Sequence, residues 1–276
     1  GADELMDNIN QNCRNDRPVL MSAVPNLILS EDTPRNNAFN LNDFFGDADG
    51  DELIFSASGN NEVNIEINDG FVSFSPGKDY FGTENVVFTT SDGVENADSN
   101  NVVLTVNNVN DNPFLTNSIE NLDWEEDTEN SIDLRNYFDD VDSTELAFSA
   151  SGNSKVSIEI NNGIARLIPE NDFFGAENVV FTTSDGLGNV ESNTVLLTVN
   201  NVNDIPVLSN NIPDLNWDED NEFSINLNDY FSDADDDELV FSANGNNEIR
   251  ISILDGAADF SQNEHWHGSE SVIFTA

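Results

Sequence analysis

Acidic residues return at fixed spacings along this chain, each time beside residues that favour turns. Carboxylate and amide oxygens are the ligands that Ca²⁺ prefers, and a site needs six to eight oxygens that converge from several loops. The recurring positions are the pairs Asp47/Asp49, Asp140/Asp142 and Asp233/Asp235, the Ser-Asp-Gly residues Asp92 and Asp185, the glutamates Glu31, Glu126 and Glu219, and the pairs Asn15/Asp16, Asn110/Asp111 and Asn203/Asp204. This recurrence predicts calcium sites in loops.

An EF-hand does not explain these aspartates. That loop requires a glutamate at its twelfth position. Counted from Asp47, Asp140 and Asp233, the twelfth residues are Ser58, Ser151 and Asn244. A metal ion at these aspartate pairs must therefore take its other ligands from elsewhere in the fold.

The overall charge also favours a cation as a partner. Eight basic residues stand against 54 acidic ones, which gives a formal net charge of -46. Such a chain repels phosphate backbones and anionic lipid, so nucleic acid and anionic membrane surfaces are poor partners. The sequence contains no apolar run long enough to span a membrane. The single cysteine, Cys13, cannot form an internal disulfide, so something other than disulfides must rigidify the fold.

The acidic positions lie in three copies of one repeat. Asn-Asp-x-Pro-x-Leu segments begin at Asn15, Asn110 and Asn203. They divide the chain into an atypical N-terminal segment (1–14), repeat 1 (15–109), repeat 2 (110–202) and a C-terminally incomplete repeat 3 (203–276). Repeat 1 has two extra residues between Glu31 and Leu41, which we expect to form a loop insertion around Pro34.

Apolar residues alternate within short runs of each repeat. Val63, Ile65 and Ile67 are an example, and the runs are separated by Asn, Asp and Gly. No segment has a sustained helical period. We therefore predict an all-β chain of tandem antiparallel β-sandwiches, with immunoglobulin-like architecture and about seven strands per repeat. Leu29, Trp124 and Trp217 occupy one repeat position and are predicted to lie in the core.

Catalysis has little support in the sequence. It contains no nucleophile elbow and no phosphate-binding loop. His265 and His267 lie two residues apart and would share a face of a strand, where they could bind a transition metal, but loop and core roles are the simpler interpretation. We expect a protein that is not an enzyme.

Three elements resemble the cadherin-like repeats that occur in tandem in large bacterial surface adhesins. The linker Asn108-Val109-Asn110-Asp111-Asn112 resembles the cadherin Asp-x-Asn-Asp-Asn motif, with Asn108, and Asn201 in the next linker, in place of the first aspartate. Asp140-Val141-Asp142 resembles the cadherin Asp-x-Asp, and Ser184-Asp185-Gly186 resembles its aspartate-bearing turn. Glu31 resembles the acidic residue at the base of the preceding repeat.

The resemblance implies calcium bound between consecutive repeats, and it implies the ligand sets. The junction of repeats 1 and 2 would use Glu31, Asp79, Asn110, Asp111, Asp140, Asp142 and Asp185. The junction of repeats 2 and 3 would use Glu126, Asp172, Asn203, Asp204, Asp233 and Asp235. Asp16, Asp47, Asp49 and Asp92 would form a half site before repeat 1. Glu84 and Glu177 are rival candidates to Asp79 and Asp172.

The resemblance further implies an extracellular protein, secreted or on a bacterial surface. The leading expectation is a calcium-rigidified extender, or stalk, segment of an adhesin, with calcium ions and the neighbouring repeats as its partners. One alternative is a fibre subunit that self-associates by strand exchange, with the segment 1–14 as a possible donor. The other is a module that binds a surface glycan or a cell through an aromatic platform such as Trp266.

Overall fold

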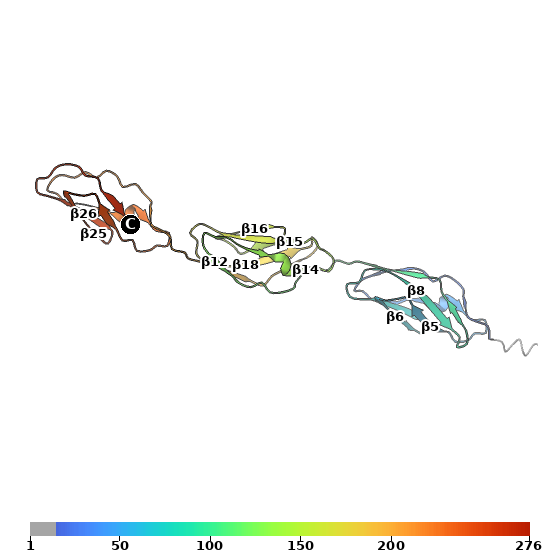
Figure 1. The fold of residues 1–276 in the computed structure, drawn as a ribbon. Coiled ribbons are helices and arrows are strands. Elements are labelled where there is room, and N and C mark those ends of the chain that lie inside the picture. The colour runs from blue at the N-terminus through green and yellow to red at the C-terminus, as the bar shows by residue number, and fades with distance from the viewer. Residues whose placement is uncertain (1–14) are drawn as a thin grey trace, which may run out of the picture. The chain divides into compact units, whose positions relative to one another are not determined.

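The computed structural model describes residues 15–276, and the predicted role of segment 1–14, Cys13 included, lies outside that range. The chain is all-β (Figure 1). Its internal contacts divide the chain into two compact units. One contains repeat 1 as far as Asn112 together with Asp140–Thr144, and the other contains Pro113–Asp139 and Glu145–Ala276.

Repeat 1 is a sandwich of two sheets. One sheet has the strand order β3-β7-β6, and the other has the order β2-β10-β8-β5 with β9 on β8. A short ladder joins β1 to β4. The strands are β1 (Val19–Leu20), β2 (Leu27–Ser30), β3 (Arg35–Asn40), β4 (Phe45–Gly46), β5 (Ile54–Ser58), β6 (Val63–Asn68), β7 (Phe71–Pro76), β8 (Gly82–Ser91), β9 (Asn96–Asp98) and β10 (Val102–Asn107), with the 3₁₀ helix η1 (Leu41–Asp43) before β4.

Repeat 2 has the same topology, with orders β13-β17-β16 and β12-β20-β18-β15, β19 on β18, and a β11-β14 ladder. Its elements are β11 (Phe114–Leu115), β12 (Leu122–Glu125), β13 (Asn130–Asp133), η2 (Leu134–Asn136), β14 (Phe138–Asp139), β15 (Ala147–Ser151), β16 (Val156–Asn161), β17 (Ile164–Pro169), β18 (Gly175–Ser184), β19 (Asn189–Glu191) and β20 (Val195–Asn200).

The predicted fold class is confirmed, with one refinement. Seven strands in each of repeats 1 and 2 have four or more residues. The first of these strands, however, pairs parallel with the last, as β2 with β10 and β12 with β20. The sandwiches are therefore antiparallel except along that edge.

The cores form because alternate residues point inward from both sheets. Phe74, Phe88 and Leu104 are fully buried in repeat 1, and Leu167, Phe181 and Leu197 are fully buried in repeat 2. Leu29 and Trp124 are buried, and Trp217 is half-buried and stacks on Phe223, so the predicted core position holds.

Tight turns and close approaches fix the register. Asp69-Gly70, Asn162-Gly163 and Asp255-Gly256 have positive φ and connect the hairpins. At Gly152 a Cβ would lie 2.4 Å from the carbonyl oxygen of Asn178, so only glycine fits where this loop crosses β18.

The two extra residues of repeat 1 are not a loop insertion, and that prediction is wrong. They lie within β3, whose register against β7 shifts between Arg35 and Phe39, with Asn37 at a φ of 48°. A β-bulge absorbs extra residues without breaking the sheet. The bulged strand places Phe39 against Phe74 and Phe88, and this apolar packing keeps the segment in the sheet.

Repeat 3 has one complete sheet and one short one among its described residues. The first has the order β22-β26-β25, the second pairs β24 with β27, and β21 pairs with β23. Its elements are β21 (Val207–Leu208), β22 (Phe223–Asn226), η3 (Leu227–Asp229), β23 (Phe231–Ser232), β24 (Ser242–Asn244), β25 (Ile249–Leu254), β26 (Ala257–Gln262) and β27 (Ile273–Thr275). Of the described helical segments, none is long and apolar enough to cross a membrane.

Candidate metal centres

Three aspartates from separate parts of repeat 1 and its linker converge on one point. Asp32, Asp79 and Asp111 each offer a carboxylate oxygen, and these oxygens lie within 4.8 Å of one another. We call this cluster the first junction. Because calcium–oxygen bonds are 2.3–2.6 Å long, oxygens at this separation can contact one ion.

The same arrangement returns one repeat later. Asp127, Asp172 and Asp204 also place carboxylate oxygens within 4.8 Å of one another, and we call them the second junction. In both junctions the two loop aspartates have left-handed backbones, with φ of 54° at Asp32 and 56° at Asp79. The N–H of Asp79 donates to Asp32 Oδ1 at 3.2 Å, and the N–H of Asp172 donates to Asp127 Oδ1 at the same distance.

A buried glutamate precedes each of the first aspartates. Glu31 is 1% exposed and Glu126 is 2% exposed. One carboxylate oxygen of each accepts the N–H of a linker valine, from Val109 at 2.5 Å and from Val202 at 2.6 Å. The other oxygen is buried and has no hydrogen-bond donor within residues 15–276. A buried carboxylate without compensation is costly, so the arrangement calls for a cation.

The linker aspartates show the same deficit. The N–H of Asp111 donates to Asp142 Oδ2 at 2.5 Å, and that of Asp204 donates to Asp235 Oδ2 at 2.6 Å. The Oδ2 atoms of Asp111 and Asp204 are buried and have no donor in the described part of the chain. Loss of solvent, and then the charges of Asp32, Asp79 and Asp142, raise the pKa of Asp111.

The pKa of Asp204 is raised for the same reasons. Loss of solvent contributes most, followed by the negative charges of Asp172, Asp235, Asp127 and Glu126. Both junctions therefore hold several negatively charged carboxylates close together. A divalent cation would reverse that penalty.

The Asp-x-Asp loops are held by their own backbones. The N–H of Asp142 donates to Asp140 Oδ1 at 2.8 Å, and the N–H groups of Asp235 and Asp49 donate to Asp233 and Asp47 at 2.9 Å. Such Asx turns leave the second carboxylate oxygen available for other ligands. Two further clusters of carboxylates within 4.8 Å arise here: Asp47, Asp49 and Asp51, and Asp233, Asp235 and Asp237.

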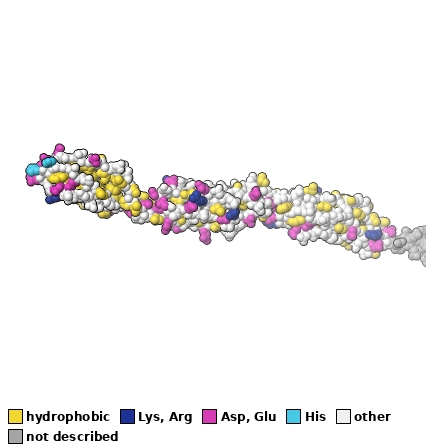
Figure 2. Space-filling view, turned by 45° about the horizontal axis from the view of Figure 1, so that its top comes forward, with side chains coloured by type: hydrophobic (Ala, Val, Ile, Leu, Met, Phe, Trp, Pro, Cys, Tyr) yellow, Lys and Arg dark blue, Asp and Glu magenta, His cyan; other side chains and the backbone are white. Residues whose placement is uncertain are grey.

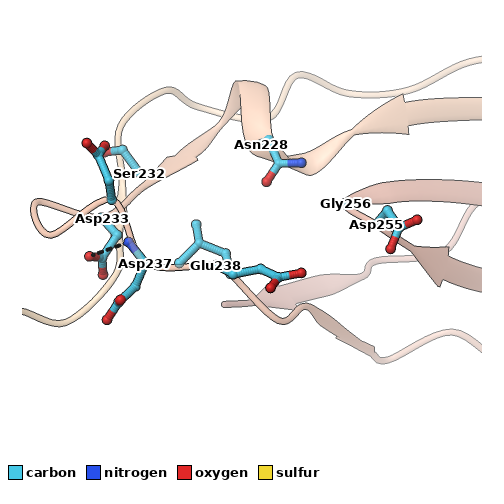
Figure 3. Close-up of a pocket in the computed structure, with 9 residues that line it drawn as sticks. Asn228, Ser232, Asp233, Asp237, Glu238, Asp255 and Gly256 are labelled. Carbon is cyan, nitrogen blue, oxygen red and sulfur yellow. Dashed lines mark hydrogen bonds between the residues drawn. The ribbon is translucent and has the colours of Figure 1, made fainter.

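The loop of repeat 3 borders an acidic pocket. A cavity of about 390 Å³ is lined by Asp233, Asp237, Glu238, Asp255 and other polar residues. Figure 3 shows Asp233 and Asp237 at one end of it, where the N–H of Asp237 donates to Asp233 Oδ1, and Asn228 and Asp255 toward the other end. The acidic loop is thus open to the cavity and reachable by ions.

The remaining predicted residues fall outside these clusters. The side chains of Asn110 and Asn203 donate to the next backbone carbonyl, at 2.7 and 2.6 Å, and so shape the linkers. Asp185 accepts the N–H groups of its own turn from Leu187 and Gly188. Before repeat 1, the N–H of Asp16 donates to Asp49 Oδ2 at 2.6 Å.

Asp92 also caps its own turn. Its carboxylate accepts N–H groups from Val94 and Glu95 and the side-chain amide of Asn15. Hydrogen bonds from the backbone at Glu95, then from Asn15, hold the pKa of Asp92 below its usual value. The Asn15 side chain therefore joins the linker to this turn, and Asp92 lies outside the carboxylate clusters of the described residues.

Sequence reasoning missed four cluster members: Asp32, Asp127, Asp51 and Asp237. Asp32 and Asp127 directly follow the predicted Glu31 and Glu126, and Glu219-Asp220 repeats the pair. The recurrence of Glu-Asp, rather than of Glu alone, was the signal that could have found them. In repeat 3 the N–H of His265 approaches Asp220 Oδ1 at 3.4 Å, so His265 takes the place of Asp79 and Asp172.

Glu84 and Glu177, the rivals for the metal role, serve another purpose. The carboxylate of Glu84 accepts the backbone N–H groups of Asn61, Glu62 and Val63. Glu177 and Glu270 bind the corresponding loops of repeats 2 and 3 in the same way. A carboxylate saturated by three backbone donors anchors a loop, and among the described residues neither Glu84 nor Glu177 belongs to a metal-capable cluster.

Two family matches agree with this geometry. Residues 15–105 match the bacterial Ig domain family, and residues 109–200 match the cadherin-like domain family. A comparison with curated proteins finds no significant match.

Solved structures that are similar to this chain have low sequence identities and low TM-scores. Titin domains Z1Z2 in complex with telethonin are 11% identical with a TM-score of 0.29, and the alignment covers 68% of this chain and 98% of that one. Sidekick-1 immunoglobulin domains 1–4 are 14% identical with a TM-score of 0.33, over 67% and 49%. An endo-fucoidan hydrolase of glycoside hydrolase family 107 is 19% identical with a TM-score of 0.33, over 66% of this chain and 28% of the hydrolase.

These TM-scores carry no argument about function. The family matches and the sheet topology agree over two parts of the chain. Residues 15–105 match the bacterial Ig domain family and residues 109–200 match the cadherin-like domain family, so these two parts are Ig-like and cadherin-like repeats in tandem.

Proposed function

We propose that this chain is a calcium-rigidified extender segment of an extracellular adhesin on a bacterial surface. The observation that carries the proposal is the pair of buried glutamates, Glu31 and Glu126, each with one oxygen on a linker N–H and one without a donor in the described residues. Calcium there would contact the edge of one repeat, the linker aspartate and the Asp-x-Asp loop that binds it. An ion shared in this way couples the orientation of consecutive repeats.

Charge supports the same role. A chain with a net charge of -46 repels itself, and flexible linkers between acidic sandwiches would let the repeats pivot. Calcium at the junctions offsets the repulsion where it is most concentrated. We further propose that the segment is not an enzyme, because its acidic clusters recur in successive repeats as structural elements do.

Small-angle X-ray scattering and thermal unfolding of the whole chain test this proposal. Added calcium should give a longer, narrower distance distribution and a higher unfolding midpoint, and EDTA should reverse both changes. Sodium chloride at matched ionic strength is the control for simple screening. Scattering and unfolding curves that are identical in calcium and in EDTA would reject the extender role.

A second candidate function, strand acceptance by repeat 3, is favoured by one observation. A groove of about 1,030 Å³ is lined by Leu215, Trp217, Phe260, Trp266 and Phe274, among others. Figure 2 shows hydrophobic side chains gathered on this repeat, which also carries the two histidines. In repeat 2 the corresponding place lies between β12 and β18 and is filled by β20. The equivalent of β20 in repeat 3 would follow Ala276, so a continuation of this chain would fill the groove as well as a partner strand would.

A strand of the same type would fit this groove by β-augmentation. A synthetic peptide with the sequence of residues 194–201 should bind repeat 3 and protect the amides of Gly268–Val272 from hydrogen exchange. A peptide with serine in place of Val195, Leu197 and Val199 is the matched control. Equal binding of the two peptides, or binding of neither, would exclude strand acceptance. For the glycan-binding alternative, Trp266 is partly buried against the core of repeat 3 and lines the same groove.

A further inference from the structure

A lysine contacts the first junction and has no counterpart at the second. Lys78 Nζ lies 2.5 Å from Asp79 Oδ2, within an ion pair and hydrogen bond. The position equivalent to Lys78 is Asn171 in repeat 2 and Glu264 in repeat 3. Asn171 precedes the ligand candidate Asp172 as Lys78 precedes Asp79, so the two junctions differ by one positive charge at the same place.

The ammonium group of Lys78 contacts the first junction through Asp79. The carboxylate of Asp79 offers an oxygen within 4.8 Å of carboxylate oxygens of Asp32 and Asp111, so the positive charge lies beside the whole cluster. At the second junction the equivalent residue is the neutral Asn171.

A second difference acts in the same direction. The Asp-x-Asp loop of repeat 3 continues into Asp236-Asp237, and Asp237 joins the cluster of Asp233 and Asp235. The loop of repeat 2 continues instead into Ser143-Thr144. The Asp-x-Asp loop that bonds to the second junction therefore carries more negative charge, and no lysine lies at the position of Lys78. The Asp-x-Asp loop that bonds to the first junction carries less negative charge, and Lys78 lies beside that junction.

We propose that Lys78 is a built-in competitor of calcium, which weakens binding at the first junction so that the second junction fills first. The inference rests on the proposed calcium-binding function and adds an order of filling to it. An ion that enters the first junction must displace the ammonium group from Asp79 and then sits beside its positive charge. At the second junction the neutral amide of Asn171 imposes no such competition.

The size of the effect follows from the exposure of Lys78. Its side chain is 84% exposed, so solvent screens the interaction. We expect a difference in calcium affinity of about two- to fivefold at low salt, the range that an exposed ion pair supports. The difference should shrink as sodium chloride is raised, because exposed charges are screened within a Debye length of about 10 Å at 0.1 M.

A reciprocal swap in the whole chain tests the inference. Calcium is titrated while backbone amide signals are followed by NMR, with Val109 as the reporter of the first junction and Val202 as that of the second, because these amides bind Glu31 and Glu126. In the native chain Val202 should respond at the lower calcium concentration. Lys78→Asn should move the Val109 midpoint toward that of Val202, and Asn171→Lys should move the Val202 midpoint the other way.

Lys155→Asn is the control for the loss of a surface lysine in repeat 2, because Lys155 pairs with Glu170 at 2.6 Å rather than with a junction aspartate. It should leave the Val109 midpoint unchanged. Coincident midpoints in the native chain, or a Lys78→Asn variant whose Val109 midpoint does not move, would overturn the competitor role while calcium binding itself stands. If neither amide responds to calcium, the proposed function fails instead.

Discussion

Glu31 and Glu126 show how a single buried carboxylate can demand a ligand. One oxygen of each is bonded to a linker N–H, and the other has no donor among residues 15–276. A buried acceptor of this kind costs folding energy in the absence of a cation and gains it when one binds. A mutation that removes the charge of this carboxylate should therefore weaken calcium binding, whereas in the absence of calcium it should not lower the stability of the fold.

Glu126→Gln tests this expectation. The amide oxygen can still accept the N–H of Val202, but the charge is lost. We expect calcium affinity at the second junction to fall about tenfold or more, because a charged carboxylate makes stronger contacts than a neutral amide does. In EDTA the same variant should unfold at an equal or higher temperature than the native chain. Calorimetric titration and thermal unfolding measure the two effects.

Glu129→Gln is the control for that variant, because Glu129 is exposed and pairs with Arg166 on the surface. It should change neither calcium affinity nor the unfolding midpoint in EDTA by much. A Glu126→Gln variant that binds calcium as the native chain does would remove Glu126 from the metal site.

The raised pKa values of Asp111 and Asp204 predict how pH acts on the metal-free chain. A folded-state pKa above the unfolded value of about 3.9 means that the folded chain binds the proton more tightly. These groups therefore destabilise the fold at neutral pH, and the penalty is relieved as pH falls through their raised pKa values. In EDTA, the unfolding midpoint should rise as the pH is lowered from neutrality toward these raised pKa values.

Saturating calcium should reverse this slope, because protons then compete with the ion for the same oxygens. The double variant Asp111→Asn, Asp204→Asn should lose most of the pH dependence seen in EDTA. If acidification over this range lowers the midpoint of the native metal-free chain, the electrostatic account of the junctions is wrong.

At the scale of elements, a glutamate anchors the loop before β6 and its equivalents in the later repeats. Glu84 accepts three backbone N–H groups from residues 61–63 at the start of β6, and it is itself buried. The same contact recurs at Glu177 and Glu270, where backbone hydrogen bonds hold the pKa of Glu270 below its usual value. These glutamates stabilise the sandwich and lie outside the clusters of junction aspartates among the described residues.

Glu84→Ala should therefore destabilise repeat 1 and leave calcium affinity unchanged. Loss of a charged acceptor leaves several backbone donors unpaired, which costs about 2 to 3 kcal/mol. Urea unfolding in EDTA measures the loss, and Glu66→Ala, at an exposed strand position, is the control. A Glu84→Ala variant that keeps its stability but loses calcium would restore Glu84 as a metal ligand.

How much of this could be predicted differs between elements. The repeat period and the alternation of apolar residues were sufficient for the sandwich, because both are properties of local sequence. The bulge in β3 was not predictable, because it depends on Phe39 packing against Phe74 and Phe88 from other strands. The parallel pairing of β2 with β10 likewise joins segments from opposite ends of a repeat.

The site followed the same division. Asp111 and Asp204 were predicted because they recur in the linkers, and Asp79 and Asp172 belonged to the ligand sets that the resemblance implied. Asp32 and Asp127 were missed because, among 54 acidic residues, the prediction used only the glutamate of each recurring Glu-Asp pair. Asp32 and Asp127 enter the clusters because their loop backbones are left-handed and because their carboxylates accept the N–H groups of Asp79 and Asp172. These hydrogen bonds join residues that are far apart in the sequence.

For the whole molecule, the proposed function makes the two junctions the places where the high net charge is offset by bound calcium. Acidic surface alone would attract a diffuse cloud of cations that salt displaces. Carboxylates held within 4.8 Å of one another, with buried oxygens that have no donor in the described chain, should instead bind a small and fixed number of ions. Stoichiometry therefore separates the two possibilities.

Calorimetric titration of calcium into the native chain and into Asp111→Asn, Asp204→Asn and the double variant tests this claim most directly. The account predicts saturable binding to the native chain, loss of one set of ions in each single variant, and loss of both sets in the double variant. The same number of calcium ions on the double variant as on the native chain, or no saturable binding to the native chain, would contradict it.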